Sequence, residues 1–243
     1  MLSFLKKKWC LAEVSLEGAA DLARQLSLPI EVTVLLVNRG VSTKEQADQF
    51  LASDLTQLHD PFLMAGMDRA VERVIRAIEN KESITVFCDY DVDGVTSAAF
   101  LTHFFRDLNC QVSAYLPERQ AEGYGLNSEA VRKIRDQGAS LMITADCGIT
   151  GVKEVALANE LGLDVIVTDH HQVGEEGLPQ AIAVLNPHRK ECDYPFRFLS
   201  GVGLAFKLAI GVRNGLHSVG RKKEDLPNLK RHLDLFALGT IAD

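Results

Sequence analysis

The stretch that decides the fold is ITVFCDYDVDGVTSAAFLTHFF, residues 84–105. Its first part, 84–88, is apolar and β-branched and predicts a buried strand. Residues 94–108 carry apolar side chains at helical spacing and predict a helix. Between the strand and the helix lies an acidic turn with three aspartates, Asp89, Asp91 and Asp93. The stretch therefore predicts a strand, a turn and a helix, with carboxylates at the end of the strand.

The same alternation of strand and helix continues along the chain. Further strands are predicted at 111–116, 140–145, 164–168 and 181–186, and further helices at 127–138, 151–162 and 201–215. Apolar strands that alternate with amphipathic helices indicate a sheet that is covered on both faces. We therefore expect an α/β fold, a mostly parallel sheet flanked by helices.

The chain before this sheet has a helical pattern. Residues 41–53 place Val41, Ala47 and Phe50 on one face, and residues 67–80 repeat apolar pairs at helical spacing. Ser42 or Thr43 can cap the first of these helices. We expect a small helical N-terminal region at 1–68 and a catalytic domain at 69–243.

The composition excludes several classes of protein. Of the 243 residues, 47% are hydrophobic and 24% are charged, which argues against intrinsic disorder. No stretch approaches the roughly 20 apolar residues of a membrane span. Five cysteines without a CxxC pair disfavour a zinc ribbon and favour reduced thiols in a cytoplasmic protein. The net charge of −7 argues against nonspecific coating of nucleic acid, but it is compatible with a local basic groove.

Four of the predicted strands end in polar side chains. The strand at 84–88 leads into the acidic turn. The strands at 140–145, 164–168 and 181–186 lead into Asp146-Cys147-Gly148, Asp169-His170-His171 and Asn186-Pro187-His188-Arg189. Ligands of open parallel sheets bind outside the carboxyl ends of the strands. These side chains are therefore expected around one crevice.

Each motif alone has a simpler interpretation. The three aspartates resemble a calcium loop, but an EF-hand needs a preceding helix and a Glu at position 12, where this chain has Phe100. Asp146 alone fits a helix cap, and His170-His171 alone fits a polar loop. Their joint occurrence favours a metal site, because carboxylates crowded in a partly dry crevice repel one another unless a cation compensates them.

Carboxylate and imidazole ligands suit Mn²⁺ or Mg²⁺. Several such ligands can hold two ions about 3.5–4 Å apart, the spacing of phosphate-cleaving sites. Two ions activate a water molecule and stabilise the charge that develops on phosphoryl oxygens. The residues thus predict hydrolysis of a phosphate ester or anhydride.

The motifs at 89–94, 145–149 and 169–171 together resemble the DHH phosphoesterase superfamily. Within it, the chain is most similar to the RecJ-like single-stranded-DNA-specific 5′-to-3′ exonucleases. This resemblance covers the chain from about Gly40 onward. It is carried by LPERQAEGYGLN (116–127), LNPHRKECDYPFRFLSGVGLAFKLA (185–209) and LDLFALGTIAD (233–243).

The resemblance implies roles for individual residues. It implies metal ligands at Asp91, Asp93, Asp146, His170 and Asp243, with Asp146 bridging two Mn²⁺ or Mg²⁺ ions. It implies that His171 contacts the scissile phosphate and acts in catalysis with Asp91, Asp93, Asp146 and His170. Asp89 and Asp169 match neighbouring acidic positions that orient the ligands. Where some superfamily members carry a His, this chain has Phe87, and water is expected to fill the ligand position.

The resemblance also implies a path for the nucleic acid. It implies substrate contacts at Arg119, Tyr124, Asn186, Arg189, Gly201 and Gly203. The amides of the 201–203 turn are expected to bind a phosphate. Arg197 and Lys207 are further candidates for lining this path.

The expected function is a metal-dependent exonuclease that releases nucleotides from single-stranded DNA in DNA repair and recombination. A helicase and a single-strand-binding protein are the expected protein partners. One alternative is a DHH phosphoesterase on short oligonucleotides or cyclic dinucleotides, and another is a non-catalytic replication scaffold of the same fold. A scaffold should have lost ligands, whereas every matched Asp and His position is filled. The DHH-associated and oligonucleotide-binding domains of RecJ-like proteins are absent from these residues, so we expect weak activity.

Overall fold

The computed structural model divides the chain into two compact units, Met1–Leu58 and His59–Asp243. It describes residues 8, 10, 13, 15–52, 54–118, 123 and 125–243. The boundary lies earlier than the one expected between residues 68 and 69. The reason is that the segment after Leu58 is bound to the second unit, where Lys207 Nζ donates a hydrogen bond to the carbonyl of His59 at 2.6 Å.

The N-terminal unit consists of short helices around a small core. Its elements are α1 (Leu16–Leu26), α2 (Ile30–Val37), α3 (Lys44–Leu51) and the 3₁₀ turn η1 (Leu55–Gln57). Ser15 caps α1, and Thr43 caps α3 in a reciprocal capping box with Gln46. The core is formed by Leu22, Leu36, Val41 and Ala47. Local capping and one apolar cluster thus account for the unit.

The second unit is built on a five-stranded sheet in which every strand pair is parallel. The strands are β1 (Ile84–Cys88), β2 (Val112–Tyr115), β3 (Leu141–Ala145), β4 (Asp164–Thr168) and β5 (Ala183–Leu185), in the order β2-β1-β3-β4-β5. The last residues of neighbouring strands pair in register, Cys88 with Ala145, Ala145 with Thr168, and Thr168 with Leu185. The expected α/β class is confirmed, and the register aligns four strand ends in one row.

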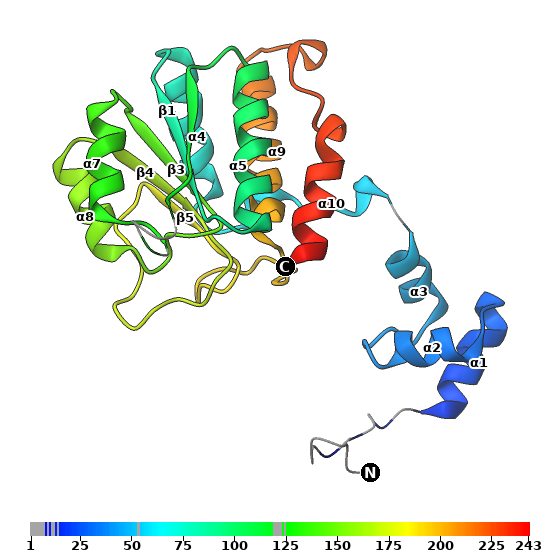
Figure 1. Ribbon diagram of the computed structural model, residues 1–243. Helices are drawn as coiled ribbons and strands as arrows, with labels where there is room; N and C mark the ends of the chain where they lie inside the picture. Colours follow the sequence, from blue (N-terminus) through cyan, green and yellow to red (C-terminus); the bar gives the residue numbers. More distant parts are fainter. Residues whose placement is uncertain are drawn as a thin grey trace. The chain divides into compact units, whose positions relative to one another are not determined.

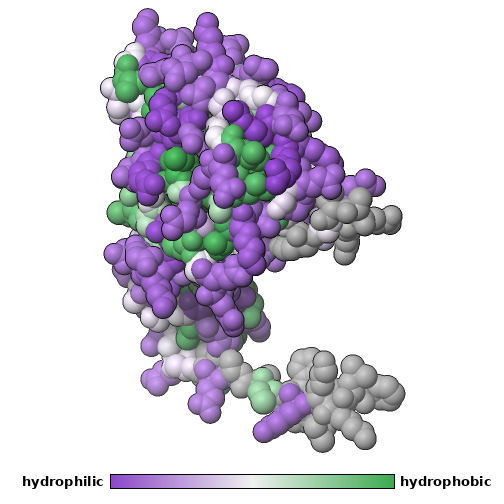
Figure 2. Space-filling view, turned by 90° about the vertical axis from the view of Figure 1, so that its left-hand side faces the viewer, coloured by the Kyte–Doolittle hydropathy of each residue, from purple (hydrophilic) through white to green (hydrophobic). Residues whose placement is uncertain are grey.

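Helices cover both faces of the sheet (Figure 1). One face carries α4 (Met67–Glu79), α5 (Val92–Asp107) and α9 (Gly201–Ser218), and the other carries α7 (Ser128–Asp136) and α8 (Val152–Glu160). The helix α10 (Leu233–Ala242) packs against α5 and α9. The short turns are η2 (Pro61–Leu63), η3 (Lys223–Asp225) and η4 (Leu229–His232). The side that carries α7 and α8 is mostly hydrophilic (Figure 2), as expected of an outer helix layer.

Alternating side chains of the strands fill the two cores. Val86 and Ile143 pack under α4, α5 and α9, whereas Phe87 and Met142 pack under α7 and α8. Phe87 is fully buried there and stacks on Tyr115 with ring centroids 5.6 Å apart.

The strand order reverses direction between β1 and β3, because β2 lies on one side of β1 and the later strands lie on the other. Such a switch point leaves a crevice at the carboxyl ends of the strands. The polar residues that follow β1 and β3 are therefore brought together by topology alone. Among the described residues, no helix is long and apolar enough to cross a membrane.

Candidate metal centre

Asp146 lies directly after β3, at the switch point of the sheet. It is 1% exposed, and its backbone has a φ of 64°, a left-handed conformation that side-chain-bearing residues seldom adopt. Strain of this kind persists only where the surroundings fix it, and it is frequent at functional sites. Neither carboxylate oxygen has a hydrogen-bond partner among the described residues. The His170 imidazole, with Nε2 3.0 Å from Asp146 Oδ1, is a charged partner only when it is protonated, and a buried carboxylate without a cation is costly, so the residue fits a bound cation.

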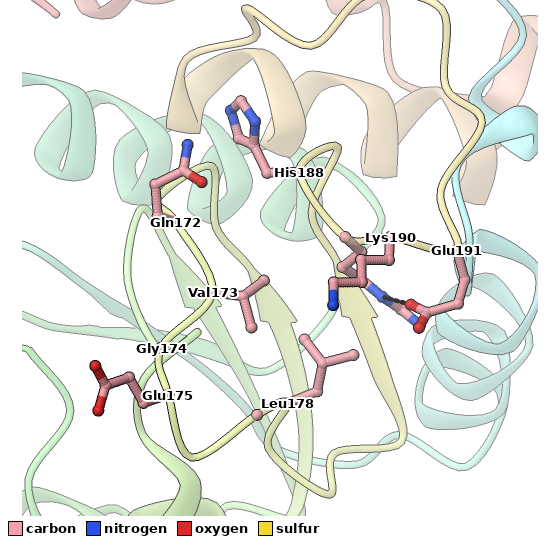
Figure 3. Close-up of a pocket in the computed structure, with 10 residues that line it drawn as sticks. Gln172, Val173, Gly174, Glu175, Leu178, His188, Lys190 and Glu191 are labelled. Carbon is pink, nitrogen blue, oxygen red and sulfur yellow. Dashed lines mark ion pairs between the residues drawn. The ribbon is translucent and has the colours of Figure 1, made fainter.

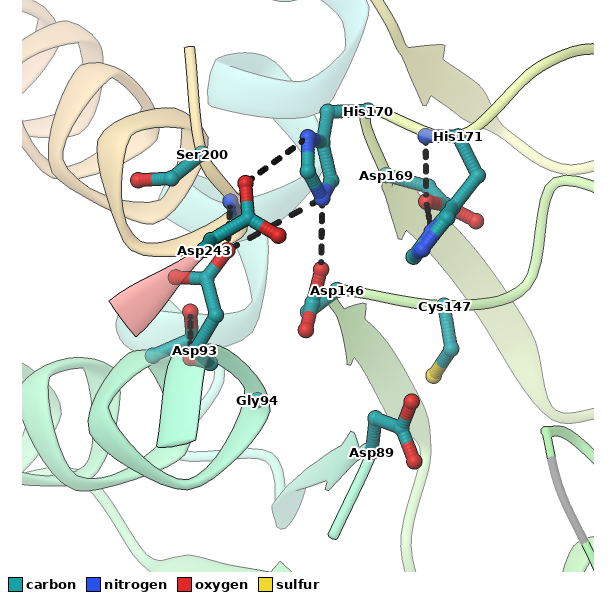
Figure 4. A network of polar contacts seen from close by, with 12 residues as sticks. Asp89, Asp93, Gly94, Asp146, Cys147, Asp169, His170, His171, Ser200 and Asp243 are labelled. Atoms are coloured by element: carbon teal, nitrogen blue, oxygen red, sulfur yellow. Dashed lines mark hydrogen bonds and ion pairs between the residues drawn. The ribbon is translucent and has the colours of Figure 1, made fainter. Parts of the chain in front are cut away.

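His170 stands between three carboxylates (Figure 4). Its Nε2 lies 3.0 Å from Asp146 Oδ1 and 3.8 Å from Asp93 Oδ2. Its Nδ1 lies 3.9 Å from Asp243 Oδ2. Nε2 is buried and makes no hydrogen bond of acceptable geometry with the described residues. The imidazole is thus placed as a metal ligand would be.

The possible ligand atoms form overlapping groups, in each of which they lie within 4.8 Å of one another. The groups are Asp93, His170 and Asp243; Asp89, Asp91 and Asp146; and Asp146, His170 and His171. Because Asp146 and His170 each belong to two of the groups, these residues would hold two neighbouring cations. Oxygen-rich ligand sets with imidazole suit Mn²⁺ or Mg²⁺. Asp89, which was expected only to orient ligands, lies in one of these groups itself.

Asp93 is bound by the N-terminus of α9. Its Oδ1 accepts a hydrogen bond from the amide of Val202 at 2.8 Å, and its Oδ2 accepts one from the amide of Gly201. The amide of Gly203 donates to Ser200 Oγ at 3.3 Å. The amides of Gly201 and Gly203, which were expected to bind a substrate phosphate, are occupied in this structure by a carboxylate of the chain and a capping hydroxyl. The helix dipole instead stabilises the charge of Asp93.

Two glycines leave space for the ligand carboxylates. A Cβ on Gly201 would lie 2.5 Å from the Cβ of Asp146, and a Cβ on Gly239 would lie 2.8 Å from Asp93 Oδ1. Gly239 is a residue that the sequence did not single out. The available signal was a glycine inside a helical pattern, which usually has a packing reason.

Burial and mutual repulsion control the acidity of the centre. Burial raises the pKa of Asp146 to about 7, the charge of Asp93 adds to this, and His170 opposes it. Burial also raises the pKa of Asp93, although the α9 amides act against it. Burial lowers the pKa of His170, but the carboxylates of Asp146 and Asp243 outweigh it, so the pKa is raised overall. The metal-free centre therefore holds protons that a cation would displace.

His171 forms a pair with Asp169. Its Nδ1 lies 2.7 Å from Asp169 Oδ1, and Asp169 Oδ2 accepts from the amide of Ile149 at 2.8 Å. This hydrogen bond raises the pKa of His171 to about 9. Because Asp169 takes Nδ1–H, the Nε2–H of a half-exposed imidazolium remains for an anionic ligand.

Replacing Asp169 by Asn should bring the pKa of His171 from about 9 down toward its ordinary value of 6.5, because the carboxylate that stabilises the imidazolium is removed. Most of the positive charge of His171 at neutral pH should then be lost. An NMR titration of the histidine Cε1–H signals in the metal-free chain measures this, with His188 as the internal control. A pKa of His171 that stays near 9 in Asp169→Asn would contradict the assignment.

Two residues after β5 donate hydrogen bonds to backbone carbonyls of the chain. Asn186 is fully buried, and its Nδ2 donates to the carbonyl of His171 at 2.9 Å. Arg189 Nη1 donates to the carbonyl of Val184 at 2.6 Å. Both hydrogen bonds go to the chain's own backbone, whereas the resemblance implied substrate contacts at these two residues.

The remaining candidates for the nucleic-acid path have different outcomes. Lys207 is 2% exposed with its ammonium on the carbonyl of His59, so its placement on that path is wrong. Arg197 is exposed. Arg119 and Tyr124 lie outside the described residues.

Comparison with known proteins places these features in a family. Residues 83–240 match the family described as the DHH family, N-terminal domain. The chain is 43% identical over 238 residues to the single-stranded-DNA-specific exonuclease RecJ of Bacillus subtilis, and 36% identical over 243 residues to that of Escherichia coli. These alignments cover 98% of this chain in both cases.

Solved structures agree with the sequence comparison. The structure of RecJ from Thermus thermophilus in complex with Mn²⁺ has a TM-score of 0.72 and 28% identity, over 96% of this chain and 31% of that one. A manganese-bound exonuclease RecJ has a TM-score of 0.65 and 34% identity, over 74% of this chain and 43% of that one. The chain spans 29% of the Bacillus subtilis relative and 41% of the Escherichia coli relative. With its three motifs gathered at the switch point of a matching fold, the chain belongs to the DHH family.

Proposed function

We propose that this chain is the catalytic part of a metal-dependent phosphodiesterase that removes nucleotides from the 5′ end of single-stranded DNA. The observation that carries the proposal is the buried carboxylate of Asp146, which belongs to two of the groups of ligand atoms and lies 3.0 Å from His170, a residue of the third. The choice of substrate is supported by the similarity to RecJ proteins that are named as single-stranded-DNA-specific exonucleases. Strands of this kind would be supplied by a helicase and held by a single-strand-binding protein, which we propose as partners.

Mn²⁺ or Mg²⁺ would be held by the carboxylates around Asp146 and by His170. One group of ligands is Asp89, Asp91 and Asp146, and the other is Asp93, His170 and Asp243. When bound, two such cations supply Lewis acidity toward a phosphoryl oxygen and toward water. The manganese and magnesium complexes of RecJ structures support this choice of metal.

The chain's own residues position and polarise the phosphate. His171, protonated at neutral pH, donates from Nε2 to a phosphoryl oxygen and so stabilises negative charge as it develops there. Asp169 fixes the orientation of the imidazole through Nδ1. The α9 amides hold Asp93 at the same edge of the site, which keeps the ligand geometry rigid.

The proposal is tested by comparing substrates in Mn²⁺. We expect release of mononucleotides from a 5′-phosphorylated single strand, with little release from the matching duplex and none in EDTA. Faster hydrolysis of a cyclic dinucleotide than of any strand would favour the alternative phosphoesterase. Absence of both Mn²⁺ binding and hydrolysis of any of these substrates would favour the scaffold.

Acidification should weaken Mn²⁺ binding. The pKa of Asp146 is raised to about 7, so below that pH the cation has to displace a proton from a ligand. The affinity should fall by about tenfold for each pH unit below about 7 if one proton is displaced. Calorimetry at several pH values measures this. An affinity that is constant from about pH 5.5 to about pH 8 would show that these carboxylates are not the ligands.

A further inference from the structure

A cavity of about 660 Å³ lies beside the metal centre, between the loop that follows β4 and the loop that follows β5 (Figure 3). Gln172, on its rim, is the residue after His171. His188, also on its rim, donates its amide to Asn186 Oδ1 at 2.7 Å, and Asn186 holds the carbonyl of His171. The cavity wall and the backbone of His171 thus form one hydrogen-bonded unit.

The lining combines an apolar surface with polar groups that are free to bind. Val173 and Leu178 are half-buried and supply the apolar part. The side chains of Gln172, His188 and Lys190 make no hydrogen bond or ion pair with any other part of the chain that the structure describes. Polar groups around an apolar surface are typical of a small-ligand site, and the volume lies in the range of such sites, about 300–1,000 Å³.

The charges around the cavity nearly cancel. Arg189 Nε lies 3.8 Å from Glu191 Oε2, and the opposite charges of Lys190 and Glu175 also lie on the lining. Burial lowers the pKa of His188, and the charge of His170 adds to this, so the ring is neutral at neutral pH. A cavity with balanced charge does not select a phosphate over a neutral group. It suits a flat neutral heterocycle with apolar faces and hydrogen-bonding edges.

We propose that this cavity binds the base of the nucleotide that is being removed. The faces of the base would contact Val173 and Leu178, and the Gln172 amide would offer one donor and one acceptor to its edge. The assignment rests on the proposed function, because it takes the substrate to be a nucleotide whose phosphate lies at His171. It adds that binding depends on the base and not only on the sugar and phosphate.

The test is a comparison of two ligands by NMR titration of the whole chain. The probes are dAMP and 2-deoxyribose 5-phosphate, which has the same phosphate but no base. We expect the chain to bind dAMP at least about tenfold more tightly, because burying a base contributes more than one kcal/mol. Leu178→Trp fills the cavity and should abolish this difference. Leu35→Trp, the same change at an exposed leucine of α2, should retain it.

A second variant covers the case in which Leu178→Trp does not fold. Gln172 is exposed, so Gln172→Ala should leave the fold intact and weaken dAMP binding by about fivefold, while 2-deoxyribose 5-phosphate is unaffected. Equal binding of the two probes by the unmodified chain, or a base preference that survives both Leu178→Trp and Gln172→Ala, would overturn the proposal.

Strand hydrolysis and Mn²⁺ binding, measured on the same samples, separate the two proposals. Hydrolysis without base-dependent binding would refute only the proposed base site. Base-dependent binding without hydrolysis would support the proposed base site and refute the proposed nuclease function.

Discussion

Asp146→Ala is expected to lower the rate of strand hydrolysis by about 10³-fold or more, because Asp146 belongs to one group of ligand atoms and its Oδ1 lies 3.0 Å from His170 Nε2 of the other. Further ligand substitutions in that background should add little, since residues that act as a unit have non-additive effects. The measurement is single-turnover release of the 5′-terminal nucleotide in Mn²⁺. A rate near that of the unmodified chain would show that the metal centre lies elsewhere.

Asp146, which is expected to be essential for hydrolysis, should destabilise the folded chain when no metal is bound. The pKa of Asp146 rises from 3.8 in the unfolded chain to about 7 in the fold, so the folded state prefers the protonated carboxyl. The stability that this group contributes is complete below pH 3.8 and is lost as the pH rises through about 7. Above that pH the buried carboxylate costs up to about 4 kcal/mol. In EDTA at about pH 8, Asp146→Asn should therefore raise the free energy of unfolding.

In Mn²⁺ the unmodified chain should be the more stable of the two, because the cation binds its folded state and stabilises it by mass action. Urea denaturation with EDTA and with Mn²⁺ measures both effects. Asp136→Asn, at an exposed aspartate at the end of α7, is the matched control and should change neither value by more than about 0.5 kcal/mol. Destabilisation by Asp146→Asn in both conditions would contradict the conclusion that the ionised carboxylate of Asp146 destabilises the metal-free fold.

Gly201→Ala should damage the centre without removing a ligand. The added Cβ would lie 2.5 Å from the Cβ of Asp146 and 2.7 Å from its Oδ1, on the helix turn whose amides hold Asp93. Mn²⁺ affinity and hydrolysis should each fall by about 10²-fold, with a loss of about 1–3 kcal/mol in stability from overpacking. Calorimetry and the strand assay measure the first two effects.

Gly203→Ala is the control for that experiment. It lies on the same turn of α9, but its Cβ would meet chiefly the flexible end of Leu199 at 3.2 Å. The change should leave Mn²⁺ affinity unaltered and raise helix stability by up to about 1 kcal/mol. Equal losses of Mn²⁺ affinity and hydrolysis in the two variants would mean that the first turn of α9 tolerates no added side chain. The effect of Gly201→Ala could then not be attributed to its contact with Asp146.

The class of fold was predictable from the sequence because its signals are local. The run at 84–88 and the helix after it carry their own periodicity, and the strand β4 was found with its observed ends. The gathering of Asp89, Asp146 and His170 followed from their position after strands, since parallel strands share one carboxyl edge.

The parts that the sequence did not predict depend on long-range packing. Nothing in the sequence of the 201–203 turn indicates that the amides of Gly201 and Val202 bind the carboxylate of Asp93, which lies far away along the chain. Lys207 looks like a surface cation, yet it is buried against the carbonyl of His59. Asn186 reads as a site residue, whereas its partner is the backbone of His171. Each of these outcomes is decided by which residues the folded loops bring into contact.

The central claim is that the crevice after β1, β3 and β4 is a centre for two cations that meet at Asp146. The most direct test is calorimetric titration of the metal-free chain with Mn²⁺ at about pH 8, where the ligand carboxylates are ionised. We expect two Mn²⁺ ions to bind each unmodified chain and each Asp136→Asn chain, and Asp146→Ala to lose high-affinity binding of both. No binding by the unmodified chain, or undiminished binding by Asp146→Ala, would contradict the account.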